Sequence, residues 1–594
     1  MTDFLVVVGN GLGADAWFER GLRAAANAGS GAPTFDVRGP RVRAAAWARR
    51  NRSGGGTAVD RERWLIASGT WFSDDGTSSG DEAQLLRASK ERDPASIGNG
   101  LEGFFALAHG DRTTATIVTD PMGCRHVYAR AENGIAAAGT SALVLAALDT
   151  TALDPVGCQE FLATGVMYED RTPYAAVRAL PPAAVIALDG GTWQLRARTW
   201  SIRSLDPETL DANEAVEAFG SAMTAVCRRV ARALPRPVAE LGAGWDSRIL
   251  CAFLRKADVG FETTVTGRPD DVDVVLSSRI ARRVGLRHHV IPAGAPPDFD
   301  EIVGSITLTD GLCDALGFAR VHRAHAELSR SFGASLDGSF GEVARGCGWE
   351  LLGSRPADLA SLDAEPIARR HYAADATPLA LWSPTERLDP LPHFTALVRR
   401  LDAELECGPR SFRLDRLHLR MQMRCRHGRI AGSTDRHWPC LSPLSFRSAL
   451  EPLLRTRASA RRNNRLARAV LARFAPDLAR LPLATGGTAM PRTPWNAWRF
   501  APEALRFAKQ FLGRPARART IEESAAERLS LWSDERVHDL LDARRMALGD
   551  HVDREALAAL VKATRAPSLE PESLFGNLLA LELGLRRLKS MRGA

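Results

Sequence analysis

The first 200 residues alternate short apolar runs with polar turns. The runs are FLVVV, RWLIAS, FFALAHG, TATIVTD, HVYAR and AAVIALD, and glycine, aspartate and serine recur between them. Short apolar runs bounded by such turn residues are typical of β-strands. The pattern predicts a mainly antiparallel sheet arrangement with a few helices in this part of the chain.

The pattern changes at about residue 211. Long stretches with helical apolar spacing are interrupted there by four strand-like segments, VAELGAG, FETTVTG, HHVIPAG and GASLDGS. Strands that alternate with helices favour a parallel α/β sheet. Beyond about residue 400 the pattern is almost wholly helical. We therefore expect two domains, 1–205 and 206–594, with a helical extension in the second from about residue 400.

Composition narrows the class of protein. The hydrophobic content of 45% and the charged content of 25% are ordinary for a soluble globular protein. The longest uncharged apolar stretch, 134–148, is shorter than the roughly 20 residues of a membrane-spanning helix, and the N-terminus lacks the basic region of a signal peptide. The nine cysteines occur without a CxxC pair, which favours reduced thiols. We expect a cytoplasmic protein that does not bind membranes.

Residues 401–480 are rich in arginine, with seventeen Arg against seven Asp or Glu. An arginine-rich face can bind nucleic acid, but interleaved aromatic residues are missing here. Apolar residues instead recur at helical spacing, at Leu414, Leu417, Leu419 and Met421. We expect solvated helix faces, or a surface for an anionic substrate, and no nucleic-acid partner.

A glycine cluster near the N-terminus matches a relaxed dinucleotide-binding pattern. Residues 9–14, GNGLGA, follow an apolar run, and Asp36 lies downstream at a suitable distance. The segments that follow do not continue a βαβ series. We therefore interpret the cluster as a turn after an edge strand.

The stretch ELGAGWDSRIL, residues 240–250, has the pattern of a strand, a glycine turn and a helix start. In an α/β sheet ligands bind at such strand ends, and the next helix presents unpaired N–H groups. The small residues 242–244 let the backbone approach an anion. Ser247 offers a hydrogen bond, Arg248 a charge, and Asp246 a ligand for Mg²⁺. The alternative is an ordinary glycine turn capped by Asp and Ser.

A second stretch, LDGSFGEVARG at 336–346, also follows a short strand and offers carboxylates among glycines. Between the two stretches, Thr264 and Thr266 lie near the end of a third strand, and Asp271 to Asp273 open the following helix. Two strand-end loops that carry acids would meet over one Mg²⁺-nucleotide.

The order of these motifs resembles the asparagine synthetase family. The synthetase half of that family has a Ser-Gly-Gly-x-Asp-Ser pyrophosphate loop and a later Ser-Gly-Glu-Gly-Ala-Asp-Glu loop. The resemblance extends over nearly the whole chain. Further similar stretches are LEGFFA at 101–106, Asp120-Pro121-Met122-Gly123 with Tyr128, Ser141, Gly165, Thr172, Leu180-Pro181-Pro182, Trp200, and RHWPCL at 436–441.

The resemblance implies an α+β Ntn-hydrolase-like, glutaminase-type sandwich. An α/β parallel-sheet ATP-pyrophosphatase domain of the adenine nucleotide alpha hydrolase kind follows it, with a helical C-terminal part. It also implies ATP and Mg²⁺ as cofactors. The implied catalytic residues are Asp246, Ser247, Arg248 and Ser339. The implied nucleotide-binding residues are Leu241, Gly242, Ala243, Gly244, Trp245, Asp246, Ser247, Thr264, Thr266, Asp337 and Gly338. The implied metal ligands are Asp246 and Glu342.

The chain departs from the family in its first half. Thr2 stands where the family exposes an N-terminal Cys nucleophile, and Ser68-Gly69-Thr70 stands in place of the glutamine-binding Asn-Gly-Glu, although Asp81 matches. These departures imply that glutaminase activity is lost. The nitrogen would then come from the substrate itself or from free ammonia.

The second half departs too. Gly242 and Ala243 replace Ser and Gly, and Ser339 stands where asparagine synthetases have Glu and β-lactam synthetases Tyr, so the base is unassigned. The segment 481–487 lacks the Lys that the family offers there. Arg480 or Arg492 would have to substitute for it, although an arginine is not an equivalent point charge.

A lost glutaminase beside a retained ATP site is similar to β-lactam synthetases and lasso-peptide cyclases. The resemblance then implies that a carboxylate is adenylated and that an amine of the same substrate attacks it, closing a macrolactam in a peptide. The expected partners are a peptide or small carboxylic acid and a leader peptidase or precursor-binding protein. The alternatives are an amidotransferase that uses ammonia or a partner glutaminase, and a catalytically dead binding scaffold.

Overall fold

The computed structural model describes residues 3–48, 56–73, 75–201, 205–346, 363–371, 377–404, 408–501, 521–566 and 573–593. Thr2 lies outside these ranges. No helix in the described ranges is long and apolar enough to cross a membrane. The seven cysteines that the structure describes are free and buried.

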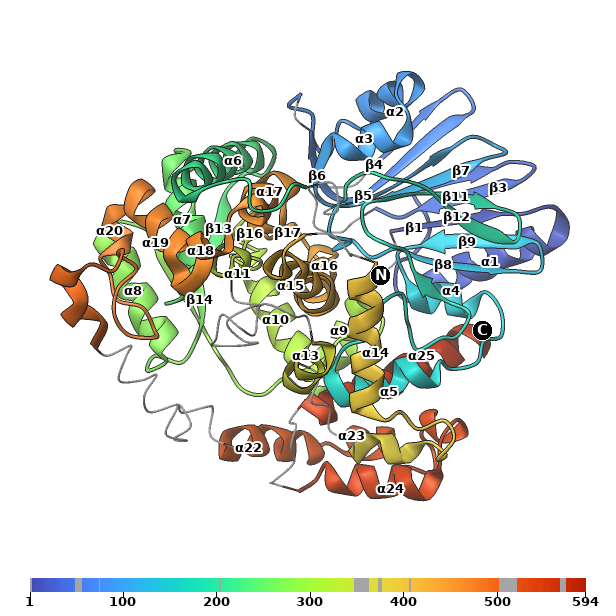
Figure 1. Ribbon diagram of the computed structural model, residues 1–594. Coiled ribbons are helices and arrows are strands. Elements are labelled where there is room, and N and C mark those ends of the chain that lie inside the picture. The colour runs from blue at the N-terminus through green and yellow to red at the C-terminus, as the bar shows by residue number, and fades with distance from the viewer. Residues whose placement is uncertain are drawn as a thin grey trace.

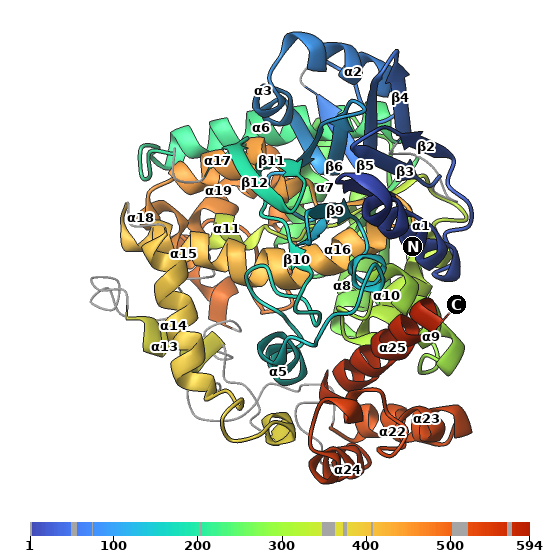
Figure 2. The same cartoon turned by 90° about the vertical axis from the view of Figure 1, so that its right-hand side faces the viewer.

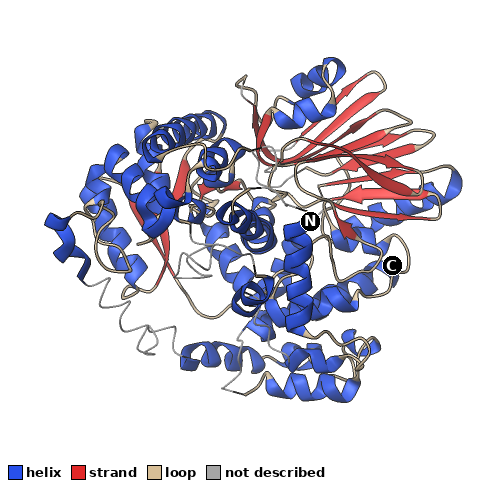
Figure 3. Cartoon of the chain, viewed as in Figure 1, coloured by secondary structure: helices blue, strands red, loops and turns tan. Residues whose placement is uncertain are grey.

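Two six-stranded sheets face each other in the first part of the chain (Figures 1 and 3). Neighbouring strands in both sheets run antiparallel. The first sheet has the order β10 (Arg178–Ala179), β8 (Tyr128–Glu132), β9 (Ile135–Gly139), β1 (Phe4–Val8), β3 (Val42–Ala46), β2 (Phe35–Arg38). The second has the order β12 (Thr192–Arg198), β11 (Ala184–Asp189), β7 (Ala115–Thr119), β6 (Leu101–Gly110), β5 (Arg63–Ser73), β4 (Gly56–Asp60). The expected antiparallel arrangement is confirmed.

The apolar run of β1 fits a strand whose two faces are both buried, one by the other sheet and one by helices. Phe4, Val6 and Val8 point into the core between the two sheets. Leu5 and Val7 point the other way, into a core formed with helices. Alternate residues of a strand face opposite sides of the sheet, so an unbroken apolar run fits a strand that is buried on both faces. β1 lies between β9 and β3, so the glycine cluster at 9–14 follows a central strand, and the expected edge strand was wrong.

Helices cover both outer faces of the sandwich. α2 (Glu82–Glu91) and α3 (Pro94–Asn99) cover the second sheet. The first sheet is covered by α1 (Gly11–Asn27), α4 (Ala142–Ala147), α5 (Pro155–Thr164) and α25 (Ser573–Gly593). α25, from the end of the chain, contacts α1, α4 and α5; Figure 2 shows it in red, with its C-terminal end below α1. The core of the first region is therefore completed by the last helix; the boundary at 205/206 stays a prediction.

A five-stranded parallel sheet forms the centre of the second region. Its order is β15 (His288–Pro292), β14 (Glu262–Gly267), β13 (Pro237–Glu240), β16 (Ala334–Leu336), β17 (Cys440–Leu441), and each neighbouring pair is parallel. From β13 the chain builds outward to β14 and β15, and it then crosses to the other side of β13 for β16 and β17. The predicted parallel α/β sheet is confirmed.

Helices pack on both faces of this sheet. One face meets α6 (Ala212–Ala233), α7 (Asp246–Lys256), α17 (Arg447–Arg455) and α19 (Arg465–Phe474). On the other face, Val238 packs with Trp438 and with Leu328 of α10 (Ala315–Leu328). The remaining helices of eight or more residues are α8 (Val272–Val284), α9 (Phe299–Thr309), α13 (Ala364–His371), α14 (Pro390–Ala403), α15 (Arg410–His418), the π-helix Leu419–His427, α16 (Gly428–Asp435), α22 (Ile521–Trp532) and α24 (Arg554–Ala563).

Beyond residue 400 the described chain is mainly helical, as expected, but strand β17 was missed. It has only two residues, too few for a periodic pattern, and it forms through pairing with β16.

The arginine-rich segment is only in part the solvated surface that its composition suggested. Six of its arginines are buried: Arg416, Arg424, Arg429, Arg436, Arg461 and Arg468. Arg461 pairs with the buried Asp415 at 2.7 Å, and Arg468 lies over the ring of Trp245 at 4.8 Å. Charge counting could not foresee this, because burial depends on partners that lie far away in the sequence.

A buried ion-pair network joins the two regions. Arg125 contacts Asp3, donates a hydrogen bond from Nε to Ser68 Oγ at 2.8 Å, and lies 3.2 Å from a carboxylate oxygen of Asp435 on α16. The side chains of Arg125 and Asp435 are 1% and 0% exposed. Burial lowers the pKa of Arg125 to about 9, and the negative charge of Asp435 opposes the lowering.

We expect Arg125→Met to reduce the free energy of unfolding by about 3–5 kcal/mol, because it leaves two carboxylates without their buried cation. Urea unfolding measures the loss. Arg38→Met is the control, since Arg38 pairs with Glu19 at the surface and such pairs contribute at most about 1 kcal/mol. Equal losses in the two variants would contradict a structural role for the network.

Candidate functional site

A cavity of about 550 Å³ lies at the carboxyl ends of β13, β14 and β16. Between β13 and β16 the order of the sheet reverses, because the chain leaves β13 toward β14 and returns to its other side. Crevices at such a reversal are the usual ligand sites of open α/β sheets, and this volume is in the range of small-molecule sites.

The turn from β13 to α7 forms one wall. The N–H of Gly242 donates to Ser247 Oγ at 3.2 Å, and the N–H of Ala243 donates to Asp273 Oδ1 at 2.7 Å. Asp273 lies in the first turn of α8, so two helix starts hold this turn. α7 then begins at Asp246 without a side-chain cap, and its first N–H groups favour an anion there.

The second predicted stretch lies directly against this turn. A Cβ on Gly338 would lie 2.5 Å from the backbone nitrogen of Ser247, and one on Gly341 would lie 2.5 Å from Asp246 Oδ1. Only glycines permit this approach. Between them, the fully buried Phe340 has a φ of 75°, a conformation that is costly for a bulky residue. The two stretches therefore meet, as predicted.

Two carboxylate oxygens of these stretches are buried without a hydrogen-bond partner. Asp246 Oδ1 and Glu342 Oε2 are buried and accept no hydrogen bond, while Asp246 Oδ2 is 2.8 Å from Arg345 Nη2. Burial raises the pKa of Asp246; Arg345 opposes the rise, and the negative charge of Glu342 adds to it. A cation bound by the two carboxylates would offset both causes of the raised pKa, the burial of Asp246 and the negative charge of Glu342.

Asp246 and Glu342 thus fit a Mg²⁺ ion. The described residues contain no group of three or more His, Cys, Asp or Glu side chains that could hold a metal. A Mg²⁺ ion here would take one or two protein carboxylates and complete its coordination with phosphate oxygens and water, the usual arrangement for this ion.

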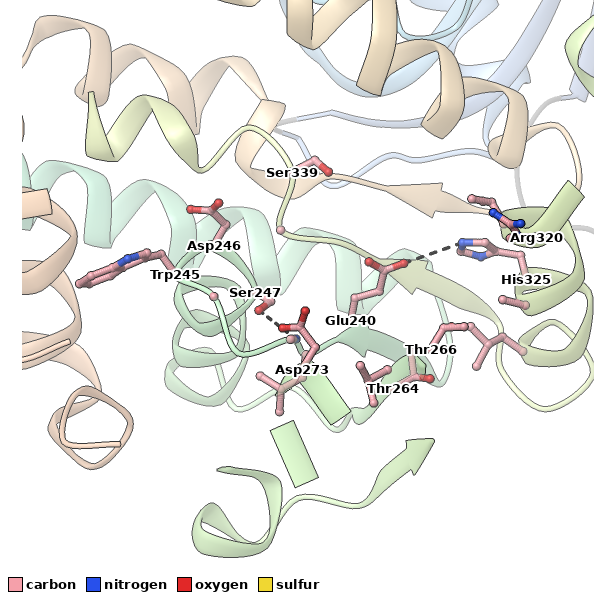
Figure 4. Close-up of a pocket in the computed structure, with 18 of the residues that line it drawn as sticks. Glu240, Trp245, Asp246, Ser247, Thr264, Thr266, Asp273, Arg320, His325 and Ser339 are labelled. Carbon is pink, nitrogen blue, oxygen red and sulfur yellow. Dashed lines mark hydrogen bonds and ion pairs between the residues drawn. The ribbon is translucent and has the colours of Figure 1, made fainter. Parts of the chain in front are cut away.

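Most of the predicted residues line the cavity. They are Leu241, Gly242, Gly244, Trp245, Asp246, Ser247, Thr264, Thr266, Gly338, Ser339 and Glu342. Figure 4 shows Asp246 and Ser247 toward one end, with Thr264 and Thr266 below them on the neighbouring strand.

The expectation that Arg248 offers a charge to the ligand is wrong. Its fully buried guanidinium points away from the cavity and donates to the carbonyl oxygens of Leu478, Leu481 and Pro482 at 3.2, 2.9 and 2.8 Å. α7 turns residue 248 toward the helices beneath it, so Arg248 fixes the 478–482 segment and offers no charge to a ligand.

Asp337 and Ala243 are not among the residues that line the cavity. The Asp337 carboxylate accepts hydrogen bonds from Ser442 Oγ at 2.8 and 2.9 Å and from the N–H of Ser339 at 2.7 Å. It anchors the second stretch to the chain after β17. The methyl group of Ala243 is buried away from the cavity, and only its backbone contributes.

The segment 481–487, where the resembled family has a lysine, lies near the site but supplies no cation to it. The N–H of Ala484 donates to the carbonyl oxygen of Ala243 at 3.2 Å, so the segment 481–487 lies against the first turn. Neither Arg480 nor Arg492 lines the cavity, whereas Arg320 of α10, which also pairs with Glu527, does.

Sequence reasoning missed Glu240, Arg320, His325 and Arg345 as site residues, and gave Asp273 no role. Glu240 carried a signal, because a charged residue ended an otherwise apolar strand. The side chains of α10 carried none, since their approach to β13 depends on packing across the sheet.

Comparison with known proteins gives little. No protein-family model matches the chain, and no curated protein matches it. One similar solved structure is glutamine phosphoribosylpyrophosphate amidotransferase from B. subtilis complexed with ADP and GMP, with a TM-score of 0.22 and 10% identity over 50% of this chain and 66% of that one, just under two thirds of its length. Another is the allosteric regulatory enzyme of purine biosynthesis, with a TM-score of 0.21 and 10% identity over 50% of this chain and 81% of that one. At these TM-scores neither similarity carries an argument.

The close approach of the two stretches is testable by adding one methyl group. We expect Gly338→Ala to lower the free energy of unfolding by about 1–3 kcal/mol, because the added carbon meets backbone rather than a flexible side chain. Gly244→Ala is a matched control in the same cavity, since its Cβ would meet nothing within 4 Å. Urea unfolding compares them, and an unchanged Gly338→Ala would show that the loops are not in contact.

Proposed function

We propose that the chain is an ATP-dependent, AMP-forming carbon–nitrogen ligase of the asparagine-synthetase kind. In this proposal the first region is an inactive glutaminase-type sandwich, and the second is an ATP-pyrophosphatase-type domain. The reaction is amide formation through an acyl-adenylate, with intramolecular macrolactam closure of a peptide as its most specific form. The substrate, its partners and a cytoplasmic location stay predictions.

One observation carries the proposal. Two stretches far apart in the sequence meet at the switch point of a parallel sheet, and each contributes a buried carboxylate oxygen without a hydrogen-bond partner, one from Asp246 and one from Glu342. Carboxylates beside an uncapped helix start make a site for a metal-bound polyphosphate. A structural turn would gain nothing from two unpaired buried oxygens, which cost free energy.

The cavity walls suggest how ATP lies in it. The start of α7 and the hydroxyl of Ser247 lie at the end suited to phosphates, and Leu241, Thr264 and Thr266 form the wall suited to the nucleoside. Asp246 and Glu342 would hold Mg²⁺, which supplies charge stabilisation to the departing pyrophosphate. The substrate carboxylate then attacks the α-phosphate, and the acyl-adenylate retains a good leaving group for the amine.

Contacts in the first region support a nitrogen source other than glutamine. Ser68 Oγ donates to Asp3 at 2.6 Å, and Thr70 Oγ1 lies 3.4 Å from Asp435 Oδ1. The stretch that would bind glutamine is thus part of the buried ion-pair network. An amine of the substrate itself removes the need for glutamine, and holding both reacting groups in one molecule removes much of the entropy cost of their encounter.

Thermal unfolding with and without Mg²⁺-ATP tests the nucleotide site. We expect stabilisation of about 2.7 kcal/mol when the nucleotide is at a hundred times its dissociation constant. Asp246→Ala should abolish the effect, whereas Asp270→Ala, an exposed carboxylate outside the cavity, should keep it. A folded wild type with no response at saturating nucleotide would favour a binding scaffold.

Glutamate release tests the nitrogen source. We expect the protein to release no glutamate from glutamine, with or without Mg²⁺-ATP, because the expected glutamine stretch is committed to buried contacts. An enzymatic glutamate assay measures it, with an active glutaminase as positive control. Turnover above the buffer blank would overturn the assignment of an inactive first region.

A further inference from the structure

Two titratable side chains face each other across the cavity from β13 and α10. Glu240 is the last residue of β13, and His325 lies on α10. His325 Nε2 is 3.9 Å from Glu240 Oε1, and Figure 4 shows the two groups pointing toward one another, away from Asp246. Neither has a part in the metal or phosphate end of the site.

The hydrogen bond behind His325 fixes its tautomer. The indole N–H of Trp438 donates to His325 Nδ1 at 3.2 Å, so Nδ1 is the acceptor and the proton of the neutral ring is on Nε2. Burial lowers the pKa of His325 to about 4, with further lowering by His437 and His322. His325 therefore directs a neutral N–H toward Glu240 and has no free lone pair with which to act as a base.

Glu240 has the opposite character. Its side chain is 48% exposed to the cavity, so a ligand reaches it. Desolvation by the surrounding protein raises the pKa of Glu240, and the negative charge of Asp337 adds to the rise. A carboxylate with a raised pKa is a better proton acceptor near neutral pH than an ordinary one.

We propose that Glu240 is the base that receives the protonated amine of the substrate, and that His325 is the residue that positions it. This inference rests on the proposed ligase function and names the group missing from it. It also predicts the substrate class: a molecule that presents a primary ammonium group at the β13–α10 end of the cavity while its carboxylate reaches the phosphate end.

The chemical step balances as follows. The ammonium group, R–NH₃⁺, gives one proton to the Glu240 carboxylate, and the free amine attacks the carbonyl carbon of the acyl-adenylate. The new C–N bond forms, the bond from that carbon to the phosphate oxygen breaks, and AMP leaves with the electron pair. The second proton of the nitrogen passes to solvent, and Glu240 releases the first one there before the next cycle.

Several charged or titratable groups surround the pair and enter any pH dependence. They are Asp337 beyond β16, Cys440 on β17, Asp273 on α8, Arg320 and His322 on α10, and His437 after α16. Asp337 is held by Ser442, and His437 lies 3.2 Å from Ser329 Oγ. Glu240 is therefore the carboxylate at this end that is open to an incoming cation.

The test uses a simple amine as probe, because the substrate is unidentified. Thermal unfolding of the full chain is followed against n-butylamine, with n-butanol as the uncharged counterpart, in the presence and absence of Mg²⁺-ATP. We expect saturable stabilisation by the amine alone, weakened about tenfold or more in affinity by Glu240→Gln, since a charge-assisted hydrogen bond is lost. Glu327→Gln, an exposed site on α10, is the control and should respond as wild type.

The pH profile separates proton acceptance from a merely structural effect. Amine binding needs the ionised carboxylate, so the affinity should fall as the pH drops through the raised pKa of Glu240, which lies above the ordinary carboxyl range. Above that pKa the affinity should reach its full value, as long as the amine stays protonated. Glu240→Gln should be flat. His325→Phe removes the Nε2–H donor and should move the fall to higher pH, because the ionised carboxylate loses a stabilising partner.

Four results would overturn the assignment. The first three are no amine response in the folded wild type, an equal response in Glu240→Gln, and an equal response to n-butanol. Weaker Mg²⁺-ATP binding in Glu240→Gln would place this carboxylate at the nucleotide instead and would also overturn it. The Mg²⁺-ATP shift, measured separately in the same experiment, reports whether the proposed ligase function fails independently of the base.

Discussion

The close packing of the 337–342 loop on the start of α7 is the constraint on which the site depends. Gly338 and Gly341 lie so near Ser247 and Asp246 that no larger residue fits. This contact converts two ordinary strand ends into one cavity, and it forces Asp246 and Glu342 to share a small volume. The raised pKa of Asp246, the ion pair with Arg345 and the strained backbone at Phe340 all arise from that proximity.

Buried arginine side chains that do not contact the cavity stabilise the same region. Arg248 fixes the 478–482 segment, and Arg125 joins the first region to α16 through Asp435. A buried arginine is stable only where carbonyl or carboxylate oxygens surround it. Each such residue therefore ties together segments that are far apart in sequence. The buried arginines of the second region act as these ties, and the polar side chains that line the cavity are mostly acids and hydroxyls.

The strand ends were predictable because local patterns determine them. β13, β14 and β16, the turn at 242–244 and the contact between the two stretches followed from apolar periodicity and glycine placement. The predicted role of Arg248 was wrong because a sequence motif gives the order of the side chains but not the direction in which each one points from its helix. His325 was invisible for another reason. Its approach to Glu240 is a product of packing across the sheet, which a single sequence does not encode in any local pattern. Arg345 lies in the quoted 336–346 stretch, but its pairing with Asp246 depends on how that loop packs against α7.

The carboxylates of the cavity lower the stability of the folded state, and this favours a functional reason for their presence. When folding raises the pKa of a carboxyl, the folded state binds more protons than the unfolded chain between the two pKa values, so stability falls as pH rises through that window. Glu240 and Asp246 both lie in this situation. An apolar residue at 240 would continue the β13 pattern without that cost. The cavity keeps both carboxylates: the charge of Glu342 acts on Asp246, and the ring of His325 lies beside Glu240. These are the separated pKa environments of a site that handles a cation at one end and a proton at the other.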